Sequence, residues 1–141
     1  MKYLFAQLIH NKIRLLCVMA LVGLISPVVT AAPTPQSIRG RTGGTVDSKS
    51  CGFVAKTPSY TMSLSQRMDY MRMLVDAQGG QPTLLIVGPK GDDRFCVLGD
   101  SDTGLKPEIS GVWEPGNYNV YVGDRYGEQH PFTLRILTNK N

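Results

Sequence analysis

The chain has 141 residues, enough for one domain, and carries 15 Lys and Arg against 11 Asp and Glu. Three of the basic residues, Lys2, Lys12 and Arg14, lie within the first 31 residues, which contain no acidic residue, and without them 12 basic and 11 acidic residues leave a net charge of +1. Apart from the pair Arg39 and Arg41, the rest of the chain shows no basic cluster, which argues against nucleic acid as a partner.

Residues 1–31 have the pattern of a secretory signal peptide. A basic start is followed by the apolar run Leu15–Ile25 and by the small-residue cleavage signature Val29-Thr30-Ala31. The run is shorter than the roughly 20 apolar residues that a spanning helix needs. We expect cleavage after Ala31, with an uncleaved anchor as the alternative. Cys17 lies inside the run, where a lipid-modified cysteine is not expected. The sequence therefore predicts a secreted or periplasmic protein with no membrane span after cleavage.

Residues 32–50 are rich in Pro, Thr, Ser and Gly and have no hydrophobic period, which predicts a flexible linker. The folded domain is expected over residues 51–138, with a short tail at 139–141.

Two cysteines, Cys51 and Cys96, remain beyond the signal segment. Cysteines in an oxidising compartment usually pair, and the bond would close a loop of about 46 residues, worth roughly 4 kcal/mol on the chain-entropy model. A redox or metal pair is the alternative. The sequence has no C-x-x-C motif to support this alternative, and His130 is the one histidine beyond the signal segment. We therefore predict a structural disulfide.

Short apolar stretches separated by turn signals predict antiparallel strands. The expected strands are residues 59–64, 83–87, 94–98, 117–123 and 132–136. The continuous run at 83–87 is typical of a strand buried on both faces. In the fourth strand, Tyr118, Val120 and Val122 should face the core, and Tyr121 the opposite side. With one cross-link, this pattern predicts an all-β fold, a small antiparallel β-sandwich.

Ser65–Ala77 is ambiguous. Read as a helix, it would have Ser65 as its cap and Gly79 as its end. Read as a strand, it would place Met71, Met73 and Val75 in the core. Strands on both sides and the turn into the 83–87 run favour a strand.

The segment TLLIVGPKGDDRFCVLGDSDTGLKPEISGVWEPGNYNVYVGD (Thr83–Asp124), followed by FTLRIL (Phe132–Leu137), resembles the bacterial pre-peptidase C-terminal domain. The shared features are the G-P-x-G turn, a P-x-I segment, the P-G-x-Y-x-V-x-V-G hairpin and a last F-T-L strand. The resemblance covers about Ser59–Leu137. It implies a jelly-roll-like β-sandwich of secreted proteins, often appended to proteases, that has no catalytic activity. The roles proposed for such domains are secretion, substrate attachment and cation binding.

Catalysis is not expected. A Ser or Cys nucleophile needs a nearby base, and His130 precedes a proline at the start of a strand, where a surface histidine is the simpler interpretation. A carboxylate pair could support glycoside hydrolysis. The candidates are Asp92, Asp93, Asp100, Asp102, Glu108, Glu114 and Asp124, most of them beside turn residues.

Two features are candidate binding sites. Asp100 and Asp102, in the loop D-S-D-T-G, place two carboxylates two residues apart, a pattern suited to Ca²⁺, with a solvated acidic turn as the alternative. Trp113 and Tyr121 are candidate ligand-binding aromatics. For Trp113 we favour packing over the end of the sandwich, and Tyr121 is the better candidate for exposure.

These patterns predict a secreted, non-enzymatic binding or accessory module, with calcium as a candidate ion. Its partner would be an extracytoplasmic protein or glycan. One alternative is a structural, envelope-associated protein without a small ligand. The other is a small secreted hydrolase that uses carboxylates.

Overall fold

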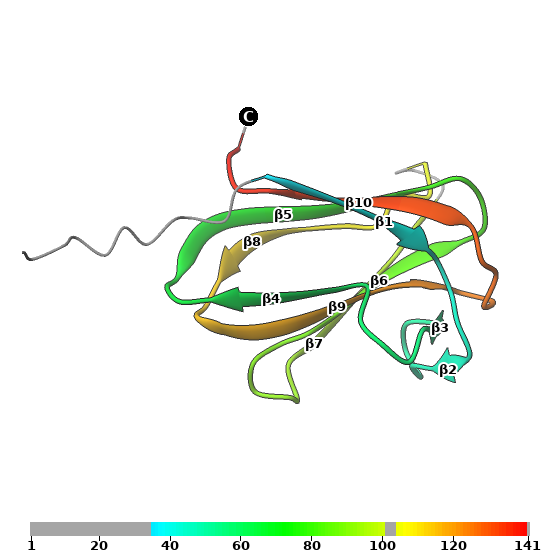
Figure 1. The fold of residues 1–141 in the computed structure, drawn as a ribbon, viewed down its shortest axis with the longest axis horizontal. Coiled ribbons are helices and arrows are strands. Elements are labelled where there is room, and N and C mark those ends of the chain that lie inside the picture. The colour runs from blue at the N-terminus through cyan, green and yellow to red at the C-terminus, as the bar shows by residue number, and fades with distance from the viewer. Residues whose placement is uncertain (1–34, 101–103, 141) are drawn as a thin grey trace, which may run out of the picture. The chain divides into compact units, whose positions relative to one another are not determined.

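Ten β-strands form the regular structure of the residues that the computed structural model describes, 35–100 and 104–140 (Figure 1). They are β1 (Gln36–Arg41), β2 (Val46–Asp47), β3 (Phe53–Val54), β4 (Tyr60–Leu64), β5 (Met68–Ala77), β6 (Pro82–Val87), β7 (Arg94–Leu98), β8 (Glu108–Trp113), β9 (Gly116–Asp124) and β10 (Pro131–Leu137). Within these ranges no helix is long and apolar enough to cross a membrane. The predicted signal peptide, residues 1–31, lies outside them.

The strands form two antiparallel sheets that pack face to face (Figure 1). The four-stranded sheet has the order β1-β10-β5-β8. The six-stranded sheet has the order β2-β3-β9-β6-β7, and β4 pairs beside β3 along β9. The predicted all-β sandwich is therefore confirmed.

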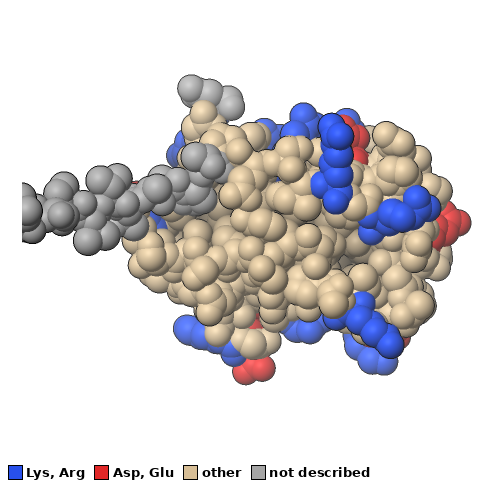
Figure 2. Space-filling model, viewed as in Figure 1, with Lys and Arg blue, Asp and Glu red and all other residues tan. Residues whose placement is uncertain are grey.

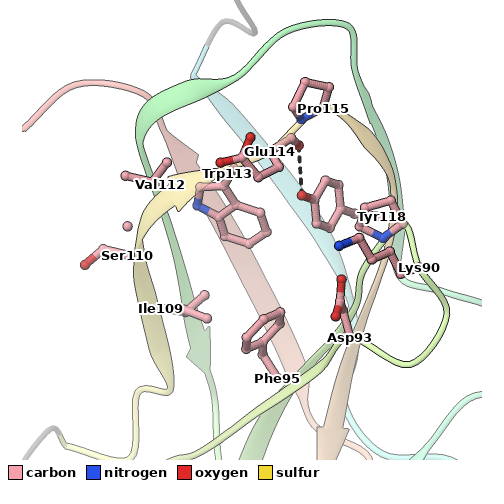
Figure 3. A pocket seen from close by; sticks show the side chains of 12 residues that line it. Lys90, Asp93, Phe95, Ile109, Ser110, Val112, Trp113, Glu114, Pro115 and Tyr118 are labelled. Carbon is pink, nitrogen blue, oxygen red and sulfur yellow. Dashed lines mark hydrogen bonds between the residues drawn. The ribbon is translucent and has the colours of Figure 1, made fainter.

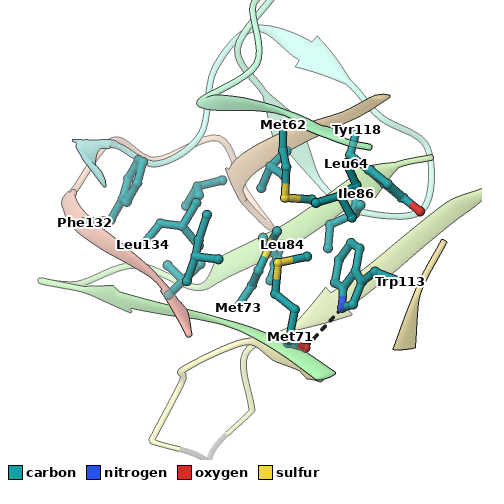
Figure 4. Close-up of a cluster of buried hydrophobic side chains, with 14 residues drawn as sticks. Met62, Leu64, Met71, Met73, Leu84, Ile86, Trp113, Tyr118, Phe132 and Leu134 are labelled. Carbon is teal, nitrogen blue, oxygen red and sulfur yellow. Dashed lines mark hydrogen bonds between the residues drawn. The ribbon is translucent and has the colours of Figure 1, made fainter. Parts of the chain in front are cut away.

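The core lies between the sheets and is made by alternate side chains of facing strands (Figure 4). Its fully buried members include Met73, Leu84, Ile86, Val120 and Leu134. The strand β6 is buried on both faces, as its continuous apolar run predicts, because Leu85 on its outer side packs in a second cluster with Cys51 and Val54.

The ambiguous segment is the strand β5, and Met71, Met73 and Val75 are completely buried in the core. The two-residue period of these side chains fits a strand between β8 and β10. A bulge between Met68 and Met71 shifts its register with β8.

The prediction of a flexible linker over residues 32–50 is wrong for residues 36–47. Gln36–Arg41 form β1, which pairs with β10, and Val46–Asp47 form β2. Ile38 packs against the core, and the hydroxyl of Thr42 donates to the Glu128 carbonyl (3.0 Å). The segment has no apolar period because β1 is an edge strand with largely exposed side chains, so backbone pairing orders it rather than burial.

Cys51 and Cys96 form the predicted disulfide, with their Cα atoms 5.6 Å apart. Cys51 is fully buried, and its carbonyl oxygen accepts a hydrogen bond from the buried Thr83 hydroxyl (2.8 Å). The disulfide therefore ties the loop before β3 to β7 across the outer face of β6.

The carboxylate of Asp124 is fully buried at the end of β9. One oxygen accepts the backbone N–H of Gln81 (2.7 Å), and the other accepts those of Tyr126 (2.8 Å) and Glu128 (3.1 Å). A Cβ on Gly80, whose φ is +71°, would lie 2.6 Å from one of these oxygens, so the turn requires glycine there. Asp124 thus holds the β5–β6 and β9–β10 turns together.

Replacing both Cys51 and Cys96 with Ala should lower the free energy of unfolding by about 4 kcal/mol, because the unfolded chain regains the freedom of the closed loop. Guanidinium denaturation measures the loss. Reductant should destabilise the wild type and leave the double variant unchanged. An unaltered unfolding midpoint would contradict this role.

Asp124→Ala should lower the free energy of unfolding by about 3 kcal/mol, because three backbone N–H groups lose their acceptor. Asp124→Asn keeps one carbonyl oxygen and should lose distinctly less. Thermal melts measure both losses, and an Asp124→Ala variant as stable as the wild type would contradict the role of these hydrogen bonds.

Candidate functional site

A groove opens along one side of the sandwich, where β7 and β8 are the outer strands of their sheets. We call it the β7–β8 groove. Its volume is about 580 Å³ (Figure 3). Its lining residues are Pro89, Lys90, Asp93, Phe95, Ile109, Ser110, Gly111, Val112, Trp113, Glu114, Pro115 and Tyr118. The β6–β7 turn, β7, β8 and the start of β9 therefore all contribute to one cavity.

One wall is the strand β8, whose side chains alternate between the groove and the outer face of the sheet. Ile109 and Trp113 point into the groove, while Ser110 and Val112 point away from it (Figure 3). Gly111 lies between the two inward side chains, and a Cβ built on it would meet no atom within 4 Å. The wall thus has an open gap at Gly111.

The end of the groove is formed by two packed aromatic rings. Trp113 is 6% exposed, and its Nε1–H donates to the carbonyl oxygen of Met71 (3.1 Å). Its ring meets that of Tyr118 edge to face, with centroids 5.3 Å apart. The Tyr118 hydroxyl donates to the Glu114 carbonyl (2.8 Å). These contacts fix both rings, so this end is preformed.

Phe95 forms the opposite wall and is 51% exposed. It lies on β7, opposite Ile86, on the side of the sheet that faces the core. Because β7 is the outer strand, the ring extends past the packed core into the groove (Figure 3). Phe95 is therefore a large apolar surface that the fold leaves accessible.

Charged groups gather at the aromatic end. Lys90 and Asp93 come from the β6–β7 turn, and Glu114 follows β8 and binds Arg67 (2.7 Å). Burial raises the pKa of Tyr118 above its usual 10.0, and the negative charges of Glu114 and Asp93 raise it further. The charges at this end of the groove are therefore mixed, with Lys90 and Arg67 balancing Asp93 and Glu114.

The two predicted ligand-binding aromatics lie on different faces. Trp113 packs inside the sandwich, as its position predicts, and contributes to the β7–β8 groove. Tyr121 lies on the outer face of the large sheet, opposite the buried Tyr118 and Val120, and is half-buried against Leu85. It lines a separate depression of about 400 Å³. The two side chains do not form one site.

The candidate carboxylates are dispersed. Asp93 and Glu114 share the groove, Glu108 binds Arg72 (2.6 Å), and Asp124 is structural. Asp92 is exposed in the β6–β7 turn. His130 packs its ring over the Gly79-Gly80 turn and lies 3.1 Å from Glu128. This places the histidine in the β9–β10 connection that Asp124 organises.

The predicted calcium loop is described only in part. Asp100 belongs to the described residues, whereas Asp102 lies in 101–103, outside them. Among the residues that are described, no three His, Cys, Asp or Glu side chains are grouped closely enough to hold a metal ion. The calcium site stays a prediction.

Sequence reasoning missed the groove itself. The sequence predicts the strand that carries Phe95, residues 94–98, but it predicts no strand over residues 108–113. The apolar positions Ile109 and Trp113 follow a two-residue period across Gly111, and this was the available signal.

The fold and groove define a disulfide-bonded, two-sheet β-sandwich with a cavity along its open side. The chain is 41% identical over 112 residues to an uncharacterized protein of Synechococcus elongatus, a match that covers 77% of this chain and 78% of that protein. The chain belongs to the same family as this cyanobacterial protein. No family model matches it, and no solved structure does.

If Asp100 and Asp102 bind calcium, excess Ca²⁺ should raise the melting temperature of the purified protein by several degrees relative to chelator, because the ion binds only the folded state. The double variant Asp100→Asn/Asp102→Asn should lose this shift, and Asp69→Asn, an exposed carboxylate elsewhere, should keep it. Identical melts with calcium and chelator would remove the site.

Proposed function

We propose that the protein is a non-enzymatic binding module that works outside the cytoplasm, and that the β7–β8 groove is its binding site. One observation carries the proposal. Phe95, which is 51% exposed, borders a cavity of about 580 Å³ whose end is built from two fixed aromatic rings. Exposed apolar groups around a preformed cavity are typical of recognition sites.

One observation and one sequence prediction support a role outside the cytoplasm. The disulfide Cys51–Cys96 is of the kind that persists in oxidising compartments. The predicted signal peptide at residues 1–31 would deliver the chain to one. We propose a secreted or periplasmic location on these grounds.

The resemblance to the pre-peptidase C-terminal domain supports an accessory role. We propose that the chain is a domain of this kind, which attaches to a partner and does not transform it. Its partner would be an extracytoplasmic protein or glycan. Calcium at the Asp100 loop would assist the fold if the predicted site exists.

A secreted hydrolase is the second candidate, because Asp93 and Glu114 both line the groove. Glu114 is held by Arg67, however, and Trp113 is buried, so the groove offers more apolar contact than free carboxylate. The experiment that tests binding also separates these two functions.

Trp113 is the single tryptophan of the chain and lines the groove, so its fluorescence reports on occupancy. We expect a panel of short peptides and oligosaccharides to contain ligands that change this emission. Phe95→Asp should abolish the response. Leu98→Asp is the matched control, because Leu98 lies on the same strand with its side chain on the other face and is 39% exposed.

A response that survives Phe95→Asp and fails in Leu98→Asp would move the site to the outer face. No response across the panel would contradict a binding role for the groove. Turnover of an oligosaccharide that is lost in Asp93→Asn would establish the hydrolase instead.

A further inference from the structure

We propose that the ligand of the β7–β8 groove is an extended polypeptide that adds to the free edge of β8 as a further strand, with one of its apolar side chains entering the gap at Gly111. This inference rests on the proposed function and names the chemical class that the groove binds. Four features of the groove carry it.

The first feature is the free hydrogen-bonding edge of β8. The Val75 N–H donates to the Pro107 carbonyl (3.0 Å), so this pair is a hydrogen-bonded one. Bonded and non-bonded pairs alternate along an antiparallel ladder. The alternation directs the backbone groups of Ile109 and Gly111 toward β5 and those of Ser110 and Val112 outward. Among the described strands β8 ends the order of its sheet, so an incoming backbone can pair with these outward groups.

The second feature is the shape of the wall. Side chains of an added strand alternate with a period of two, in step with those of β8. A ligand residue beside Gly111 would find open space, because glycine has no side chain to fill it. Ile109 and Trp113 flank that space, and Phe95 faces it from β7 (Figure 3). The gap therefore fits an apolar side chain delivered from the β8 edge.

The third feature is charge. The lining carries the carboxylates of Asp93 and Glu114 and the single ammonium of Lys90. On the outer face, Glu108 is neutralised by Arg72. Glu114 is likewise paired with Arg67, so Asp93, Glu114, Lys90 and Arg67 together carry no net charge. The groove is therefore complementary to a neutral peptide with apolar side chains.

The fourth feature disfavours a glycan. Sugars bind aromatic platforms through exposed ring faces, whereas Trp113 is buried and its N–H is already bonded to Met71. The polar groups that the groove leaves available include backbone N–H and C=O groups in strand geometry, and another backbone in the same geometry satisfies them best.

Two protein variants test the proposal, and each removes one outward N–H from a different edge of the four-stranded sheet. Ser110→Pro deletes the donor on the β8 edge without touching the bonds to β5, and edge strands tolerate proline at such positions. Ser37→Pro is the matched control on β1. The Thr42 N–H donates to the His130 carbonyl, so the alternation directs the Ser37 N–H outward as well. Thermal melts establish that both variants fold.

The probe is a short peptide that alternates valine with threonine and ends in lysine. Ser110→Pro should weaken its binding, followed by Trp113 fluorescence, by at least about tenfold, and Ser37→Pro should leave it unchanged. Two N-methylated forms of the peptide complete the test. N-methylation of the peptide amides that pair with β8 should abolish binding, whereas N-methylation of the amides on the opposite edge of the peptide should not.

Peptide binding that is insensitive to Ser110→Pro and to both methylation patterns, yet lost in Phe95→Asp, would overturn strand addition and keep the groove as a binding site. Binding of oligosaccharides in place of the peptide would also overturn it and keep the site. If the Phe95→Asp variant still binds both the peptide and the oligosaccharides, the proposed function itself is overturned. Replacing the terminal lysine with glutamate should leave binding unchanged within about twofold, and a larger change in either direction would contradict the charge argument.

Discussion

The sandwich depends on one buried carboxylate. The chain passes between the two sheets in the β5–β6 turn and again in the β9–β10 turn, and Asp124 accepts backbone N–H groups from both. The same end is tied by the Arg125 N–H, which donates to the Gln81 carbonyl (2.9 Å), and by the Gln78 N–H, which donates to the Pro131 carbonyl (2.8 Å). A buried charge costs free energy unless it is fully bonded, and here three donors satisfy it. Asp124 therefore fixes how β9, which pairs with β3, β4 and β6, stands against the smaller sheet.

This arrangement leaves an edge on each sheet that the opposite sheet does not cover. The strands β7 and β8 lie at such edges, and both border the groove. The cost of the open side is the exposure of Phe95, about 25 cal/mol for each Å² of apolar surface. The rings of Trp113 and Tyr118 seal the core behind it, so the cavity is open to ligand while the interior stays packed.

Much of the fold could be predicted from sequence, because burial leaves a local pattern. Such patterns are the continuous apolar run of β6, the two-residue alternation of β9 and the pair of cysteines. The strand β1 left none, since pairing with β10 rather than burial orders it. The groove could not be predicted either. It joins Phe95 to Trp113 through sheet order, and sequence spacing does not encode which strands become edges. The Asp100 loop is a local sequence motif whose calcium site stays a prediction, because residues 101–103 lie outside the described residues.

The two edges of the smaller sheet are protected differently, and the contrast bears on function. Exposed edge strands risk pairing with other chains, and charged side chains are a common defence. The outer strand β1 carries Arg39 and Arg41, both exposed. On β8, the charge of Glu108 is neutralised by Arg72, and the middle of the strand presents Ser110, Gly111 and the exposed Val112. The chain thus protects the β1 edge with charge and leaves the β8 edge, which lies beside the groove, able to pair with another strand. That asymmetry is expected if β8 is kept open for a backbone partner, because an edge without a role would be under the same pressure to carry charge as β1.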